Sequence, residues 1–266
     1  MVFNQVESGF HIPKLTLLEV WPLYPFIGSR NNLRVIDIGA NTGLWAASFL
    51  NVFGKQTSYY QAFEPLPGNV DRLKQRVDQS LQSQVNQFSV TSCAVGNSRK
   101  KVKLNFNSEV SAIASVPLRE VSVGQKRILH KHCIEVEQID LDSWAISTEG
   151  FEPDIIKIDV EGYEWEVLEG TKNLISQKIP SIIYYEFGKH QADRGQTFLQ
   201  FWEFFSQMGY YLYRQKVARN FFGLQYISKY SESLEEFDSM WMFCASKEKH
   251  DHRLNSPYVI GQYFEY

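Results

Sequence analysis

The sequence is poor in cysteine and shows no disulfide or zinc framework. Three cysteines, Cys93, Cys133 and Cys244, are scattered along its 266 residues without Cys-x-x-Cys spacing. This odd, dispersed set argues against a disulfide-stapled protein and against a zinc cage. It favours a reducing compartment, so we expect a cytoplasmic protein.

An excess of one charge and a long apolar run are also absent. The chain has 27 basic and 30 acidic side chains and a net charge of −3, which gives no electrostatic reason to expect nucleic acid as a partner. No apolar run approaches the roughly 18–20 residues that cross a membrane, and the first residues lack the basic and then apolar layout of a signal peptide. A composition of 44% hydrophobic and 21% charged residues is typical of a soluble globular protein.

Length and residue pattern predict one main domain, residues 32–246, with an arm at each end. The N-terminal arm, 1–31, has three prolines between residues 10 and 27, and these exclude one long helix. We expect this arm to pack on the core, with a lid over a pocket as the alternative. Within the main domain, 107–132 is a polar, Ser-rich insertion that we expect to have little regular structure, and 247–266 forms a polar tail.

From residue 32 onward, β-branched runs alternate with helical periodicity. Strands are expected at 34–38, 58–63, 88–94, 154–158, 181–187, 210–213 and 241–245, and helices at 42–52, 67–80, 162–175 and 198–208. This alternation predicts an α/β fold with a mainly parallel sheet covered on both faces. Ligands of such sheets bind beyond the carboxyl ends of the strands. Segment 102–106 is expected to pair with 133–136.

The first chemical motif is Val-Ile-Asp-Ile-Gly-Ala-Asn-Thr-Gly, residues 35–43. It places Asp37 near the end of a strand and then Gly39, Ala40, Asn41 and Gly43 in the turn to a helix. The turn departs from the Gly-x-Gly-x-x-Gly pattern that holds a dinucleotide pyrophosphate, and Asp37 would repel phosphates. It suits a cationic nucleoside without phosphates, such as S-adenosylmethionine. A tight turn with a capping acid is the purely structural alternative.

Two further strand ends carry candidates for the same ligand. Glu64, followed by Pro65, ends the next strand 25 residues after Gly39, where a carboxylate can accept both ribose hydroxyls. The third strand ends at Ala94 and Val95, which are expected to line an adenine slot, although strand packing explains them equally well.

A third group of polar residues follows the apolar strand at 154–158. Lys157, Asp159 and Glu161 alternate, so they share one face if the strand continues. Charges at a strand end cost desolvation unless they are paired or used, which makes them functional candidates. An ion pair of Lys157 with Asp159 or Glu161 is the structural alternative. Glu186 ends the following strand, and His190 lies four residues later.

With these motifs the chain resembles the FkbM family of S-adenosylmethionine-dependent methyltransferases. The segments VIDIGANTG, AFEP, SCAVGN, IKIDVEGYEWEVLEG and YYEF stand in the family's order, between about residues 33 and 190. The resemblance implies a doubly wound, mainly parallel, seven-stranded Rossmann-like methyltransferase sheet with an antiparallel last strand. It also implies methyl transfer from S-adenosylmethionine to a hydroxyl of a sugar, a glycan or a secondary metabolite. The arms and the insertion are not covered.

The mechanism that this resemblance implies needs a base, because an alcohol is a poor nucleophile. Asp159 is the first candidate, and Glu161, Glu186 and His190 follow. A divalent metal ion bound by Asp159 and Glu186 is an alternative that the sequence leaves open, although no ligand spacing predicts it. Two other functions stay open as well, an NAD(P)-dependent oxidoreductase and a non-catalytic binding module. The sequence sets neither the acceptor nor the oligomeric state.

Overall fold

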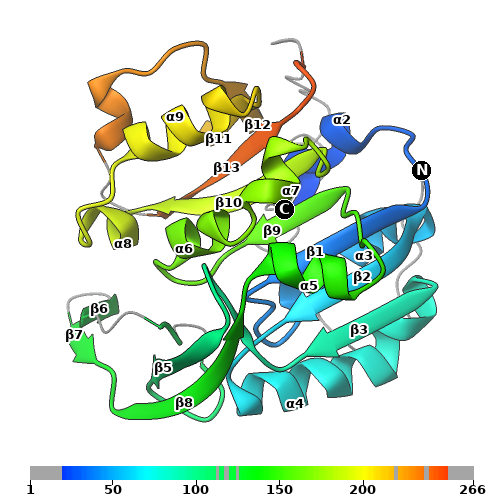
Figure 1. Ribbon diagram of the computed structural model, residues 1–266, viewed down its shortest axis with the longest axis vertical. Helices are drawn as coiled ribbons and strands as arrows, with labels where there is room; N and C mark the ends of the chain where they lie inside the picture. Colours follow the sequence, from blue (N-terminus) through cyan, green and yellow to red (C-terminus); the bar gives the residue numbers. More distant parts are fainter. Residues whose placement is uncertain are drawn as a thin grey trace, which may run out of the picture.

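A sheet of eight strands runs through the molecule (Figure 1). The computed structural model describes residues 20–111, 114–116, 120–123, 126–218, 221–236 and 240–250. In spatial order the strands are β12 (Phe221–Tyr226), β11 (Tyr211–Ala218), β13 (Met240–Ser246), β10 (Ile182–Gly188), β9 (Ile155–Ile158), β1 (Leu33–Ile38), β2 (Thr57–Phe63) and β3 (Gln87–Thr91).

The strand directions confirm the expected parallel core and antiparallel last strand. β1 pairs in parallel with β2 and β9, β2 with β3, and β9 with β10. β13 is antiparallel to both of its neighbours, β10 and β11. The expected number of seven strands is wrong by one, because β11 continues to Ala218 and pairs with an eighth strand, β12, in antiparallel fashion.

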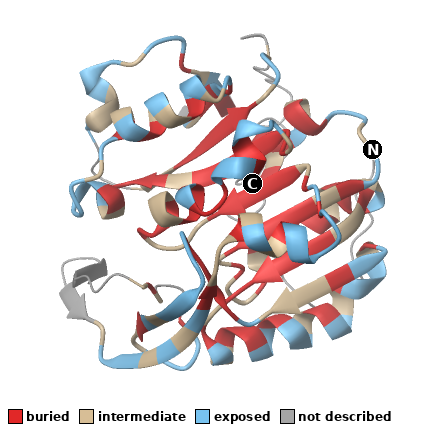
Figure 2. Cartoon of the chain, in the orientation of Figure 1, coloured by how far each residue is buried: buried red, intermediate tan, exposed pale blue. Residues whose placement is uncertain are grey.

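Helices cover both faces of this sheet, as the doubly wound prediction requires. They are α2 (Tyr24–Ile27), α3 (Leu44–Phe53), α4 (Pro67–Arg76), α5 (Leu141–Ser147), α6 (Glu164–Glu169), α7 (Lys172–Ser176), α8 (Lys189–Ala192) and α9 (Phe198–Gln207). Neighbouring strand residues point to opposite faces. Val35 therefore packs in one buried cluster with Phe49 of α3, and Ile36 packs in a second with Phe201 of α9. Figure 2 shows the sheet as the most continuously buried part of the molecule.

The expected helix at 162–175 is two helices, α6 and α7, separated at Gly170 and Thr171. Gly170 lies against the chain that follows β3, where a Cβ atom would stand 1.9 Å from the carbonyl oxygen of Gly96. This close approach leaves no room for a side chain at the break. The expected helix at 67–80 ends as α4 at Arg76 and continues as one π-helical turn, Val77–Leu81.

The described part of the N-terminal arm packs on the core. Val20, Leu23, Phe26 and Ile27 are all buried in the first cluster, and the Phe26 ring lies 4.8 Å from the ring of Tyr213, measured between centroids. The expected core packing is thus confirmed for these four residues, and residues 1–19 of the arm lie outside the described residues. So does most of the tail, 251–266.

Two small sheets lie at the lower left of the main sheet in Figure 1. One contains β4 (Ala94–Val95), β8 (His132–Ile139) and β5 (Lys100–Phe106), and the antiparallel pairing of β5 with β8 confirms the expected pair. The other is a hairpin of β6 (Glu120–Val123) and β7 (Lys126–Leu129). The expectation of little regular structure in the insertion is therefore wrong for these two strands. None of the described helices is long and apolar enough to cross a membrane.

Candidate active site

A cavity of about 410 Å³ opens at the carboxyl ends of β1, β2 and β9, where the fold predicts a ligand. Its size falls in the range of small-molecule sites, roughly 300–1,000 Å³. The predicted cofactor residues that line it are Gly39, Ala40, Asn41, Glu64, Pro65, Ala94 and Val95. Asp159 and Glu161 also line it. The predicted residues that do not line it are Asp37, Gly43, Glu186 and His190.

The turn between β1 and α3 requires glycine for two physical reasons. Gly39 has φ +75°, and a Cβ atom there would lie 1.9 Å from the backbone oxygen of Asp159. The N–H groups of Gly39 and Ala40 both donate to the carbonyl oxygen of Phe63, at 3.0 Å. These bonds fix the turn on β2 and leave neither amide available to a ligand. Gly43 has φ +81°, with Leu73 in the space that a Cβ atom would fill.

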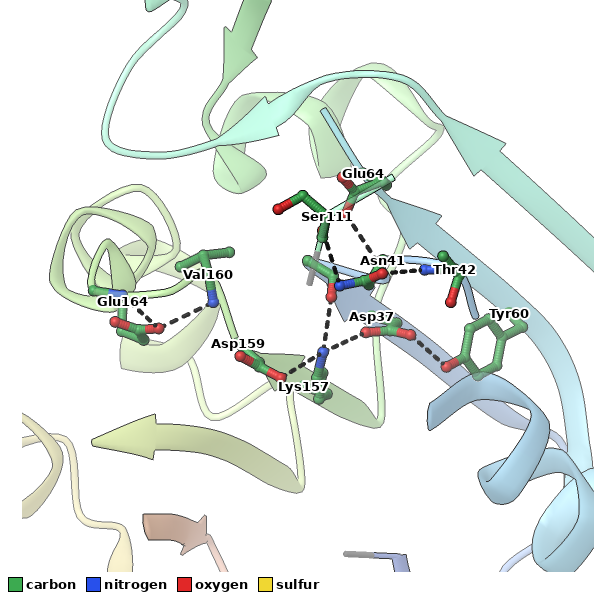
Figure 3. Close-up of polar contacts among 12 residues, drawn as sticks. Asp37, Asn41, Thr42, Tyr60, Glu64, Ser111, Lys157, Asp159, Val160 and Glu164 are labelled. Atoms are coloured by element: carbon green, nitrogen blue, oxygen red, sulfur yellow. Dashed lines mark hydrogen bonds and ion pairs between the residues drawn. The ribbon is translucent and has the colours of Figure 1, made fainter. Parts of the chain in front are cut away.

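Glu64 is a buried carboxylate on the cavity wall (Figure 3). Its Oε2 accepts from the Asn41 N–H at 2.8 Å, and its Oε1 accepts from the Leu66 N–H at 3.0 Å and from Asn69 Nδ2 at 3.2 Å. Burial raises the pKa of Glu64 above its usual 4.5, and these hydrogen bonds oppose the rise. Local structure thus fixes both oxygens beside the glycine turn.

Four residues, Asp37, Tyr60, Lys157 and Asp159, form a polar group, here the Lys157 network (Figure 3). Lys157 and Asp159 line the cavity. The parallel register of β1 and β9 sets Asp37 directly beside Lys157. Lys157 Nζ lies 3.1 Å from Asp37 Oδ1 and 3.4 Å from Asp159 Oδ2, and it donates to the carbonyl oxygen of Gly39 at 3.0 Å. The Tyr60 hydroxyl donates to Asp37 Oδ2 at 2.9 Å.

The network explains why Asp37 does not reach the cavity. Its side chain is 0% exposed, and its two oxygens contact Lys157 and Tyr60. Asp37 thus contacts Lys157, and Lys157 in turn lines the cavity. The Lys157–Asp159 ion pair that the sequence left open is present, whereas the contacts of Asp37 with Lys157 and Tyr60 were not expected.

The first part of the insertion forms one wall of the cavity. The Ser111 N–H donates to Asn69 Oδ1 at 3.0 Å, and Asn69 Nδ2 donates to the Ser111 carbonyl oxygen at 2.8 Å. A Cβ atom on Gly68 would lie 1.9 Å from the carbonyl oxygen of Glu109. These contacts hold residues 109–111 against the start of α4. The sequence analysis missed Asn69 and Ser111, since neither stands in a motif.

A second group, here the acidic cluster, contains Glu161, Glu164, Glu186 and His190. Glu161 has φ +58°, and its Oε2 lies 3.4 Å from His190 Nδ1. The buried Glu164 carboxylate accepts from the N–H groups of Val160 at 3.0 Å and of Gly162 at 3.3 Å, and it also accepts from Gln191 Nε2. The turn after β9 is therefore fixed by Glu164, which the sequence analysis did not select.

The carboxylates of this cluster perturb one another. Burial raises the pKa of Glu164 to about 7. It raises the pKa of Glu186 well above the usual value, and the charges of Asp159, Glu161 and Glu164 add to the effect. One ligand atom from each of Glu161, Glu186 and His190 lies within 4.8 Å of the others, and so does one from each of Asp159, Glu164 and Glu186. The predicted catalytic residues thus lie together around Glu186, which belongs to both groups. They are Asp159, Glu161, Glu186 and His190.

Comparison with known proteins finds a family match that covers most of the sheet. Residues 37–212 match the family described as "Methyltransferase FkbM domain". The hexuronic acid methyltransferase AglP of Haloferax volcanii is 28% identical over 171 residues, which are 59% of this chain and 62% of that protein. The chain therefore aligns with less than two thirds of this relative.

Solved structures give weaker likenesses. The methyltransferase FkbM of Methylobacillus flagellatus KT is 18% identical, with a TM-score of 0.39, over 58% of this chain and 32% of that one. The precorrin-6y C5,15-methyltransferase of Geobacter metallireducens GS-15 is 10% identical, with a TM-score of 0.46, over 91% and 96% of the two chains.

Proposed function

The chain belongs to the FkbM family of methyltransferases, and on this premise we propose that it transfers a methyl group from S-adenosylmethionine to a hydroxyl group of a sugar. The observation that carries the proposal is the fixed Glu64 carboxylate, which lines the cavity beside the glycine turn. A relative that methylates hexuronic acid supports a sugar as the acceptor.

The residues around the cavity fit an adenosyl sulfonium better than a dinucleotide. A pyrophosphate needs free backbone N–H groups in the glycine turn, but those of Gly39 and Ala40 donate to Phe63 and that of Asn41 donates to Glu64. The Glu64 carboxylate also adds negative charge to this wall, which disfavours phosphate. These contacts favour the methyltransferase over the NAD(P)-dependent oxidoreductase that the sequence left open.

Glu64 would hold the ribose hydroxyls, and Ala94 and Val95 would line the adenine. When bound, S-adenosylmethionine supplies an electrophilic methyl group. Asp159 lines the same cavity, and its side chain is 36% exposed. We propose Asp159 as the base that accepts the proton of an acceptor hydroxyl, a role that contributes about 10²–10⁴-fold to a rate. Lys157 holds this carboxylate in place through an ion pair.

Calorimetry and a turnover assay test the proposal together. We expect the wild-type protein to bind S-adenosylmethionine and S-adenosylhomocysteine, and Glu64→Ala to weaken both by about tenfold or more, since about 1.4 kcal/mol of binding energy corresponds to a factor of ten. Asp159→Asn should keep donor affinity within a few-fold and lose about 10²–10⁴-fold in turnover. Glu203→Ala removes an exposed carboxylate of α9 that does not line the cavity and serves as the control.

Acceptors are compared as pairs, a hexuronic acid glycoside against its neutral hexose counterpart, with the methylated position identified by mass spectrometry. Binding of NADH in place of S-adenosylmethionine would refute the proposal. Donor binding without turnover on any hydroxyl acceptor would favour the non-catalytic binding module. A fully active Asp159→Asn variant would remove Asp159 as the base.

A further inference from the structure

Three donor groups converge where β10 meets α8, next to the turn that follows β9. Glu161 comes from the turn, Glu186 from β10 and His190 from α8, and one ligand atom of each lies within 4.8 Å of the others. For metal–ligand bonds of about 2.1–2.4 Å, two donors on opposite sides of an ion lie roughly 4–5 Å apart. The three side chains therefore lie close enough together to share a single cation.

The Glu186 carboxylate provides a second, independent observation. Its Oε2 atom is buried and has no hydrogen-bond partner among the residues that the structure describes. The carboxylates of Asp159, Glu161 and Glu164 surround it, while Lys157, the lysine that acts on it, already pairs with Asp37 and Asp159. A buried carboxylate oxygen without a partner is costly. A shared proton or a bound cation would remove this cost.

We propose that Glu161, Glu186 and His190 form a binding site for a divalent cation. Two carboxylates and one imidazole form a mixed set of oxygen and nitrogen donors, which suits Mn²⁺ and its first-row neighbours better than Ca²⁺, which prefers oxygen alone. The set differs from the pair of Asp159 and Glu186 that the sequence left open. It leaves Asp159 paired with Lys157.

Glu161 connects the cation site to the cavity, because Glu161 also lines that cavity. A cation held by Glu161 would be accessible to oxygen atoms of a substrate, such as neighbouring hydroxyls or a carboxylate. It would also offset the negative charge that Glu161 and Asp159 present to an acidic sugar. This substrate role depends on the proposed function, whereas cation binding itself does not.

Mn²⁺ binding to the chelator-treated full chain tests the site directly. Electron paramagnetic resonance measures free Mn²⁺, and we expect one bound ion per chain. Glu186→Gln and His190→Gln should each weaken binding by at least about tenfold, the lower end of the effect seen even for residues that only support metal ligands. Asp193→Asn is the matched control, because it removes an exposed carboxylate paired with Lys189 near the end of the same helix. It should bind Mn²⁺ like the wild type.

Glu161→Gln, in the turn rather than in the sheet, gives a second measurement if Glu186→Gln fails to fold. Wild-type protein that binds no stoichiometric Mn²⁺, or that binds it no better than these variants, overturns the site and leaves a shared proton as the explanation. Calorimetry with S-adenosylhomocysteine on the same preparations separates the two proposals. Donor binding without Mn²⁺ binding refutes the cation site alone, and the reverse result refutes the donor site alone.

Discussion

The Lys157 network and the acidic cluster lie beside the same cavity, yet their charges are balanced differently. In the network, Asp37 and Asp159 share one lysine, and Tyr60 donates a further hydrogen bond to Asp37. In the cluster, Glu186 lies among other carboxylates, and its Oε2 has no hydrogen-bond partner in the described part of the chain. The comparison teaches that neighbouring charges can serve different ends. Asp37 and Asp159 share a lysine within the sheet, whereas the lack of a partner for the Glu186 oxygen is the reason for the cation site proposed above.

The way each group is assembled agrees with this division. Asp37 and Lys157 meet because β1 and β9 are paired in register, so their contact forms with the sheet itself. Glu161 and His190 meet through a left-handed turn and a short helix outside the sheet. A contact between loops is easier to rearrange around an incoming ion than a contact between central strands.

The largest expected effect comes from replacing Lys157, the positively charged side chain of the Lys157 network. Lys157→Met leaves the buried Asp37 without its ion-pair partner, and such a loss costs about 3–5 kcal/mol of unfolding free energy. Glu186→Gln instead removes a carboxyl group from a crowded acidic cluster, so the unfolding free energy of the metal-free protein should stay within about 1 kcal/mol or rise.

Urea unfolding of both variants at neutral pH, after treatment with a chelator, measures the two costs. Equal losses of unfolding free energy in the two variants would contradict the distinction between the Lys157 network and the acidic cluster. A double variant, Asp37→Asn with Lys157→Met, should recover part of the loss, because it removes the stranded charge. No recovery would show that Lys157 stabilises the fold through its packing and not through Asp37.

The next effect concerns Gly39, where the turn after β1 touches the strand end that carries Asp159. Gly39 and Gly195 both have φ +75°, but a Cβ atom at Gly195 meets nothing within 4 Å, and one at Gly39 meets the Asp159 backbone oxygen at 1.9 Å. Gly195→Ala should cost about 1–2 kcal/mol for the left-handed backbone alone. Gly39→Ala should cost about 1–3 kcal/mol more, since backbone atoms must move.

Thermal and urea unfolding of the two alanine variants isolate this contact, because the angle φ is the same at both positions. Gly39→Ala should also weaken binding of S-adenosylhomocysteine, while Gly195→Ala should not. Similar stability and similar affinity in the two variants would show that the turn tolerates a side chain.

Local patterns made much of the fold and part of the site predictable. Alternation of strands and helices predicted the parallel sheet, and the position of Asp37, Glu64, Asp159 and Glu186 at or beyond strand ends marked them as candidates. The additional edge strand β12 went unnoticed, because a short apolar run does not by itself distinguish a strand from core packing. The break between α6 and α7 went unnoticed too, since Gly170 is required by its distant neighbour Gly96.

Contacts between residues far apart in the chain were beyond the reach of such patterns. The sequence marks Asp37 and Lys157 separately, but only the strand register shows that they pair. Tyr60 reads as an ordinary strand residue until its hydroxyl is seen to reach Asp37. Asn69 and Ser111 form their pair of hydrogen bonds across 42 residues. Proximity of this kind is set by the tertiary fold and leaves no local signal.

The smallest expected effect concerns Glu64, whose surroundings are intermediate between those of the Lys157 network and those of the acidic cluster. Its carboxylate is buried like Asp37, yet its hydrogen bonds come from neutral N–H donors and not from a cation. Burial raises the pKa of Glu64 above 4.5, so its carboxylate gains a proton at a higher pH than an exposed one does. The protonated form loses acceptor capacity for the ribose hydroxyls.

Affinity for S-adenosylhomocysteine should therefore fall as the pH falls toward this raised pKa, beginning above the pH at which an ordinary glutamate titrates. We expect the affinity to decrease between neutral pH and the usual glutamate value of 4.5, because each protonated Glu64 removes one binding-competent molecule. Calorimetry across this range measures the decrease. A Glu64→Gln variant should bind more weakly and show a much flatter pH dependence, since residue 64 no longer titrates. A pH dependence that survives in this variant would assign the titration to another group.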